Sequence, residues 1–200
     1  MSITSPPDQT HPIGPPEDVV WPAAPMPFQA QLLTEWCWAA SVVMAAHNKH
    51  PSLTQCEVAH GLLEAPCCDG GGADPCPGMK QVRGPANVKC NLPANNEEIQ
   101  SLLKKHAGNA SDYKQSIVDE AALKAELAAT PRRPVVMGCR VNQATRHAVV
   151  VVDQHNGIYR VYDPCIGDGI DATYEALKTY GKGLSGGKWT HTGASIRDKS

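Results

Sequence analysis

The sequence predicts an α+β fold in which a helical half packs against an antiparallel sheet. Apolar residues recur at helical spacing within the first 130 residues, whereas β-branched runs bounded by turn residues follow from residue 135. The Asn156-Gly157 pair between two of these runs is a strong hairpin signal. Helices first and strands second favour α+β over the alternating pattern of a parallel sheet.

Two helices are expected soon after the N-terminal region. The first is the apolar stretch from Trp36 to Ala46, with Thr34 at the N-cap position. The second begins at Thr54, which has capping-box spacing to Glu57, and ends near Pro66. Each helix therefore starts at a residue that can accept a hydrogen bond from the orphan backbone N–H groups of the first turn.

Two further helices complete the helical half. One begins at about Asn96, with Asn95 and Glu98 as cap and box partner. The next spans Val118 to Leu127, before a proline that stops it. We expect one more short helix around Tyr174 to Tyr180.

The strands follow as β-branched runs. They span Val135 to Val141, His147 to Val152 and Ile158 to Tyr162, and a fourth is expected from Lys188 to Thr192. The second and third runs flank the Asn156-Gly157 pair, so they should form an antiparallel hairpin.

Proline content divides the chain into an arm and one domain. Eight of the seventeen prolines lie within residues 1–27, which predicts a flexible, polyproline-like arm. Residues 28–195 then form the folded domain, with a helical lobe at about 28–130 and a sheet lobe at about 131–195, and residues 196–200 form a tail.

Charge and hydropathy exclude several classes of protein. The chain carries 18 Lys and Arg against 20 Asp and Glu, for a net charge of −2, and has no basic stripe, so no nucleic-acid partner is expected. The longest apolar stretch is shorter than the roughly 20 residues that a membrane helix needs, so no membrane insertion is expected. No sequence motif indicates a cofactor.

Cys37 differs from the other seven cysteines because it stands at the first turn of an apolar helix, between Trp36 and Trp38. Unsatisfied N–H groups and the helix dipole favour a thiolate at that position, and a thiolate attacks carbonyl carbons. Gln31, six residues upstream, offers an amide that could join the Cys37 N–H in stabilising an oxyanion. Taken alone, however, the Trp-Cys-Trp triplet fits simple core packing as well.

The general base is found by elimination among eight histidines. Six lie in the arm, in or beside helices, or in turns, which leaves His147 and His191; His191 has no acid beside it. A hairpin with Val152 opposite Ile158 and a five-residue loop would set His147 opposite Asp163. Asp163 could then orient His147, and His147 could hold a nucleophile as its thiolate.

These residues, with their neighbours, resemble a known family. Gln31, the run Glu35-Trp36-Cys37-Trp38-Ala39-Ala40-Ser41, Arg146-His147-Ala148-Val149-Val150 and Tyr162-Asp163-Pro164 look like a papain-like cysteine protease. More narrowly, the chain is similar to compact bacterial proteases of that fold, which include secreted, effector and toxin enzymes. The resemblance covers roughly residues 28–192. Asp in place of the Asn often found at the third position and a short helical half are its two departures.

The resemblance implies a cysteine endopeptidase that acts on protein or peptide substrates. Cys37 would be the nucleophile, His147 the base, Asp163 its orienting group and Gln31 the oxyanion donor. An inhibitor or immunity protein at the cleft is a further expected partner. The residues themselves leave two alternatives open: another acyl-transfer enzyme on the same fold, such as a deamidase, amidase or transglutaminase-like protein, or a binding module without catalysis.

The remaining seven cysteines indicate disulfides and therefore an oxidising destination. They are Cys56, Cys67, Cys68, Cys76, Cys90, Cys139 and Cys165. Cys56 and the four between residues 67 and 90 could form two bridges, Cys139 and Cys165 a third, and spacing alone does not fix the pairs. A zinc site from Cys67, Cys68, Cys76 and Cys90 is the weaker alternative, since adjacent cysteines depart from the usual spacing. With no visible signal peptide, we expect a protein that is secreted or delivered into a target cell.

Overall fold

A six-stranded antiparallel sheet lies at the centre of the fold. In the computed structural model, the described residues are Val19, Trp21, 26–68, 88–107, 113–114, 118–140, 146–178, Tyr180 and 195–197. Within them the strand order is β1-β6-β2-β3-β4-β5. The strands are β1 Tyr113–Lys114, β2 Val135–Arg140, β3 Arg146–His155, β4 Ile158–Asp163, β5 Gly167–Thr173 and β6 Ser195–Arg197. The predicted α+β class is confirmed.

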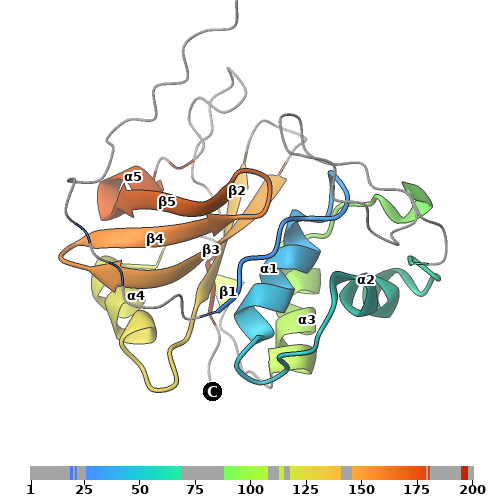
Figure 1. The fold of residues 1–200 in the computed structure, drawn as a ribbon, viewed down its shortest axis with the longest axis horizontal. Coiled ribbons are helices and arrows are strands. Elements are labelled where there is room, and N and C mark those ends of the chain that lie inside the picture. Colours follow the sequence, from blue (N-terminus) through green and yellow to red (C-terminus); the bar gives the residue numbers. More distant parts are fainter. Residues whose placement is uncertain are drawn as a thin grey trace, which may run out of the picture.

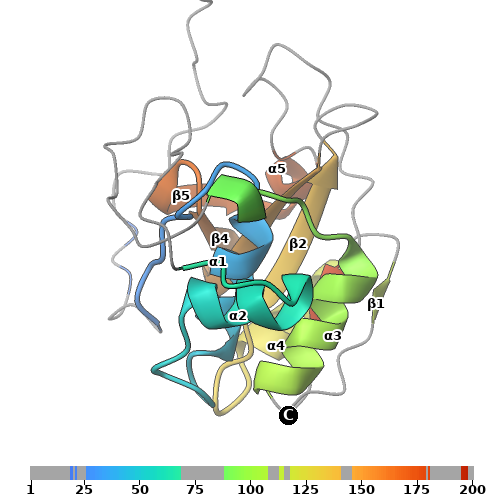
Figure 2. The ribbon, with the colours of Figure 1, turned by 90° about the vertical axis from the view of Figure 1, so that its right-hand side faces the viewer.

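Helices cover both faces of this sheet (Figure 1). They are α1 Cys37–Ala46, α2 Gln55–Leu63, the 3₁₀ turn η1 Val88–Cys90, α3 Asn96–Ala107, α4 Glu120–Leu127 and α5 Tyr174–Lys178. One core cluster joins α1, α2 and α3 to one sheet face, and a second joins α4 and α5 to the other. Figure 2 shows α2 and α3 flanking α1 on the helical side.

The helix α1 is enclosed on all sides. All ten of its residues are buried, because the sheet covers one side and α2 and α3 cover the others. A helix in this position needs apolar or small side chains all round rather than on one stripe, and its Ala, Val, Met and Trp content meets that need. The packing of α1 therefore fixes its N-terminal end firmly against β3.

Two of the predicted helix starts are confirmed. The Thr54 hydroxyl accepts from the Glu57 N–H while the Glu57 carboxylate accepts from the Thr54 N–H, which is a full capping box. Asn95 and Glu98 exchange the same pair of hydrogen bonds at the start of α3. Both helices begin where the sequence places them.

The predicted N-cap of the first helix is wrong. Trp36, not Thr34, is the N-cap residue of α1, and it makes no side-chain capping bond. The Thr34 hydroxyl instead accepts a hydrogen bond from the Asn91 amide at 2.7 Å. Asn91, 57 residues away in the chain, therefore binds the hydroxyl that the sequence predicted to cap the helix.

The β3–β4 hairpin forms, but with a tighter turn than predicted. Asn156 and Gly157 have positive φ angles of 51° and 79°, as a two-residue turn of this type requires. His155 therefore pairs with Ile158, so the predicted five-residue loop and its pairing of Val152 with Ile158 are wrong. An irregularity between Val151 and Asp153 then shifts the register by one residue, so that Val150 pairs with Tyr162.

Strand β5 was not predicted from the sequence. Its Gly-Asp-Gly-Ile-Asp-Ala-Thr sequence lacks a β-branched run, and it forms because β4 offers a free edge on which it pairs from Ile158–Thr173 to Asp163–Gly167. The strand predicted at 188–192 lies outside the described residues. No helix among the described residues is long and apolar enough to cross a membrane.

Three details bear on the predicted domain limits, which themselves stay predictions. Ile196 and Arg197, which the sequence assigned to the tail, belong to β6 and pair with Val136 and Val135 of β2. Helix α4, assigned by sequence to the helical lobe, packs Leu123 and Leu127 against the sheet. Within the predicted arm, the Trp21 indole donates to Asp171 at 2.9 Å, and Arg160 lies over its ring. At Trp21, therefore, the arm is attached to β4 and β5.

Candidate active site

Cys37 is the first residue of α1. Its side chain is 8% exposed, at the end of the helix where backbone N–H groups have no intrahelical acceptor. The helix dipole at that end favours negative charge on the sulfur. The structure thus sets the predicted nucleophile in the predicted electrostatic setting.

The segment after η1 holds the turn that leads into Cys37. The Glu35 N–H donates to Asn91 Oδ1 at 2.8 Å, and the Trp36 indole donates to the Cys90 carbonyl at 2.8 Å. The Trp38 indole donates to the Leu92 carbonyl at 3.0 Å. Residues on both sides of Cys37 are therefore fixed to one short stretch of chain, which limits the motion of the thiol.

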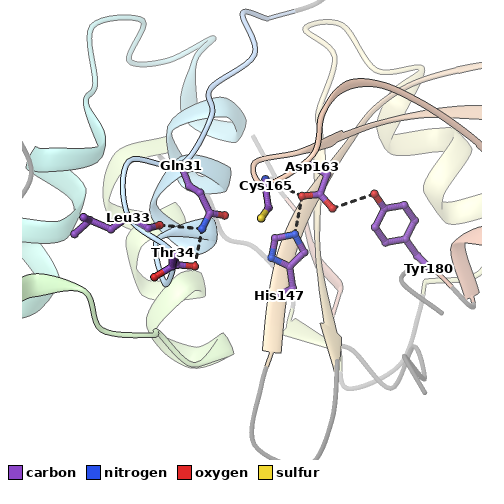
Figure 3. A network of polar contacts seen from close by, with 7 residues as sticks. All are labelled: Gln31, Leu33, Thr34, His147, Asp163, Cys165 and Tyr180. Carbon is purple, nitrogen blue, oxygen red and sulfur yellow. Dashed lines mark hydrogen bonds and ion pairs between the residues drawn. The ribbon is translucent and has the colours of Figure 1, made fainter. Parts of the chain in front are cut away.

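His147 and Asp163 form a hydrogen-bonded ion pair at one end of the sheet (Figure 3). The distance from His147 Nε2 to Asp163 Oδ1 is 2.7 Å. In the shifted register Asp163 comes opposite Val149, two residues from His147, so the two side chains are diagonal neighbours. Without the register shift between Val151 and Asp153, Asp163 would lie opposite Val150, whose side chain faces α1. The predicted proximity is right, although the predicted register is wrong.

The Asp163 carboxylate is fully buried and well supplied with donors. Its Oδ1 accepts from His147 and from the Cys165 N–H at 2.8 Å, and its Oδ2 accepts from the Tyr180 hydroxyl at 3.1 Å. Burial alone would raise the pKa of Asp163, but the charge of His147 and these hydrogen bonds hold the pKa below its usual value. Asp163 is therefore an anion around neutral pH.

His147 is charged because Asp163 and Cys37 stabilise its imidazolium form. Burial opposes the imidazolium form, but the Asp163 carboxylate, the Cys37 sulfur and hydrogen bonds to both raise the pKa of His147 to about 10. The side chains of Cys37, His147 and Asp163 are thus connected in a row. Since Nε2 faces Asp163, Nδ1 is the ring nitrogen left to face the thiol.

Gln31 lies beside this row, but its amide nitrogen is engaged elsewhere. Nε2 donates to the carbonyls of Leu33 at 2.8 Å and Thr34 at 2.6 Å. The Oε1 atom is buried and has no hydrogen-bond partner among the described residues, and Figure 3 shows it pointing toward the sheet. The Gln31 N–H donates to the Pro164 carbonyl at 3.0 Å, which ties the residue to the chain just after Asp163. The amide oxygen of Gln31, rather than its nitrogen, therefore faces the sheet.

A cleft of about 760 Å³ opens beside Cys37 and His147. Its helical wall includes Trp38, Asn91 and Ile99, and its other wall includes Gly138 and Ala148 of the sheet. Cys37 and His147 therefore line a space within the usual size range of ligand pockets.

The described cysteines form two complete disulfides, Cys56–Cys68 and Cys67–Cys90. Cys165 is disulfide-bonded as well. Cys76 lies outside the described residues. Cys139 is a free, buried thiol, so the suggested Cys139–Cys165 bridge is wrong. Cys139 lies opposite His147 in the β2–β3 pairing, and Cys165 is bonded to another cysteine.

These bridges also exclude Cys67, Cys68 and Cys90 as zinc ligands, because a disulfide sulfur has no thiolate to offer. Among the described residues there is no group of three or more His, Cys, Asp or Glu that could hold a metal ion.

Solved structures with the same fold are cysteine-peptidase-like proteins. One is a C39-like peptidase from Bacillus anthracis, 15% identical, with a TM-score of 0.53 over 88% of this chain and 95% of that chain. Another is the peptidase domain of Streptococcus ComA, a bi-functional ABC transporter, 14% identical, with a TM-score of 0.51 over 86% of this chain and 98% of that chain. The chain therefore has the papain-like fold of C39-like peptidases.

No family model matches the sequence, and no curated protein matches it.

Sequence reasoning missed two supports of the site. Asn91 and Tyr180 both make side-chain hydrogen bonds to it from distant parts of the chain. Their partners are 56 and 17 residues away in the chain, so no local pattern could have assigned these hydrogen bonds.

Proposed function

We propose that this protein is a cysteine endopeptidase that cleaves protein or peptide substrates with Cys37, His147 and Asp163. The observation that supports it is the hydrogen-bonded row of Cys37, His147 and Asp163 at the mouth of a cleft. A thiol, an imidazole and a carboxylate in that order form the arrangement that generates a thiolate nucleophile.

In the proposed reaction the Cys37 thiolate attacks the carbonyl carbon of a substrate amide and forms a C–S bond. The carbonyl oxygen becomes an oxyanion, which the backbone N–H of Cys37 can stabilise. His147 gives its proton to the amide nitrogen, the C–N bond breaks, and the amine leaves. His147 then takes a proton from water, which attacks the thioester and releases the acid and the thiolate.

Gln31 is proposed as the second oxyanion donor. Because both hydrogens of Nε2 are held by backbone carbonyls, this role requires the carboxamide to turn toward Cys37. The turn would exchange two hydrogen bonds to backbone carbonyls for one to the oxyanion and bring Oε1 against the carbonyls of Leu33 and Thr34, so the role also requires that loop to shift.

The proposed setting is an oxidising one, reached by secretion or by delivery into another cell as an effector or toxin. The disulfides Cys56–Cys68 and Cys67–Cys90 support the oxidising destination. The two structural neighbours are from bacteria, and we extend that origin to this chain as part of the proposal. An inhibitor or immunity protein that covers the cleft stays a prediction.

The test is product analysis by mass spectrometry after incubation with unfolded casein and with a folded protein substrate. Wild-type protein should cut peptide bonds, and Cys37→Ala should cut none while keeping its melting temperature. Cleavage by Cys37→Ala at the wild-type rate would overturn the proposal. A change of side-chain mass without cleavage would instead indicate a deamidase or another acyl-transfer enzyme on this fold.

Labelling with iodoacetamide tests for a binding module without catalysis. Cys37 should react faster than free cysteine at mildly acidic pH, because only a thiolate attacks the reagent. Reaction no faster than free cysteine would favour the binding module.

A further inference from the structure

The Tyr180 side chain makes a hydrogen bond that the proposed reaction has not used. Its hydroxyl donates to Asp163 Oδ2 at 3.1 Å, on the side of the carboxylate away from His147 (Figure 3). The residue is 9% exposed and belongs to the core between α5 and the sheet. It follows α5 in the chain and is 17 residues away from Asp163.

Each oxygen of Asp163 has its own donors. Oδ1 is shared by His147 and the Cys165 N–H, whereas Tyr180 is the side-chain donor to Oδ2. Asp163 has 0% exposure, so water cannot replace a lost donor without a change in packing. A buried carboxylate oxygen without a donor is costly, and the group relieves that cost by taking up a proton.

We propose that Tyr180 is a positioning residue of the site, which keeps Asp163 ionised and turned toward His147. This inference rests on the proposed function, since it concerns the same row of side chains. Tyr180 acts through Asp163 and does not contact the reacting atoms.

Among the described residues, few other groups that titrate surround Asp163. His147 reaches it from β3, the Cys139 thiol from β2, and Tyr180 from beyond α5, while Cys37 of α1 acts on it through His147. Burial, and then the nearby Asp163, raise the pKa of both Cys139 and Tyr180, so both stay neutral. Tyr180 therefore remains a donor over the whole pH range in which His147 and Asp163 change charge.

The first experiment compares Tyr180→Phe with Tyr174→Phe. Tyr174 is a matched control, because its hydroxyl also donates from the α5 region, at 2.8 Å, but to the Val118 carbonyl. The rate of Cys37 alkylation by iodoacetamide is measured against pH, with the labelled peptide identified by mass spectrometry. Casein cleavage and the melting temperature are measured on the same samples.

Tyr180→Phe should move the acid limit of Cys37 reactivity up by about one pH unit, because Asp163 then takes a proton at higher pH. Casein kcat/KM near the acid limit should fall about 10-fold. Tyr174→Phe should leave the acid limit in place, even if it lowers the melting temperature. An unchanged acid limit in a folded Tyr180→Phe protein would show a purely structural role and overturn the inference.

A second variant settles the case in which Tyr180→Phe does not fold. Incorporation of 3-fluorotyrosine at position 180 keeps the shape of the ring and makes the hydroxyl a stronger donor, so the acid limit should move down. An unchanged acid limit in the 3-fluorotyrosine protein would overturn the inference. The proposed function fails separately if wild-type Cys37 reacts no faster than free cysteine, and the role of Tyr180 then fails with it.

Discussion

The helical lobe and the sheet lobe supply their parts of the site by different means. Cys37 stands at the start of a helix. Hydrogen bonds from its neighbours to residues 90–92 hold that helix start in place, and the Cys67–Cys90 disulfide lies nearby. His147 and Asp163 owe their positions to strand register, which a single bulge in β3 sets. The proposed nucleophile thus depends on local structure with covalent support, whereas the proposed base and its partner depend on pairing across a sheet.

Because of this difference, we expect changes in the two lobes to have different effects on activity and stability. Replacement of His147 or Asp163 should remove chemistry without loosening the helical lobe, because the apolar contacts that join the helices to the sheet come from other residues of β2 to β4. Damage to the helical side should lower stability together with activity.

The largest effect is expected from His147→Ala. The thiol would lose the base that holds it as a thiolate, and kcat/KM for casein should fall by about 10⁴-fold or more. His155→Ala is the matched control, since His155 is an exposed histidine at the other end of β3. A His147→Ala protein with more than a tenth of wild-type activity would exclude His147 as the base.

A smaller loss is expected from Gln31→Ala. If the amide turns to hold the oxyanion, kcat should fall by about 10²-fold with little change in KM. Gln55→Ala provides the comparison, because Gln55 is also buried and holds the same loop through Ala30 and Leu32 without reaching the site. Equal effects of the two substitutions on kcat would restrict Gln31 to the structural role that its bonds to Leu33 and Thr34 provide.

The smallest effect on activity, and the largest on stability, should come from replacing Cys67 and Cys90 together by serine. Loss of this bridge, which spans 23 residues, should lower the free energy of unfolding by about 3 kcal/mol. It should also lower kcat/KM several-fold, since residues 90–92 would hold the Cys37 turn less firmly.

The control is the double replacement of Cys56 and Cys68, whose bridge fastens α2 and does not involve residues 90–92. It should lower stability by a similar amount and leave kcat/KM near the wild-type value. A parallel loss of activity in both double variants would show that the Cys67–Cys90 bridge has no specific role in holding the Cys37 turn.

Local signals in the sequence were sufficient for most of the helical lobe. Thr54, Glu57, Asn95 and Glu98 act within three residues of one another, so their capping boxes need no tertiary information. Thr34 marks the limit of such reasoning, because Asn91, distant in sequence, competes for its hydroxyl. The Asn156-Gly157 turn also follows from sequence, since few residues other than Asn and Gly adopt positive φ readily.

The sequence by itself determined which side chains could carry the chemistry: a cysteine at a helix start, a histidine at the start of an apolar strand and an aspartate at the end of its partner. The tertiary structure decided how they meet. A one-residue bulge, absent from any sequence pattern, brings Asp163 to the face of His147, and Tyr180 reaches Asp163 only because α5 folds back on the sheet. Helix caps arise from neighbours in the chain, whereas register and buried hydrogen bonds arise from contacts between distant segments, and those depend on the whole fold.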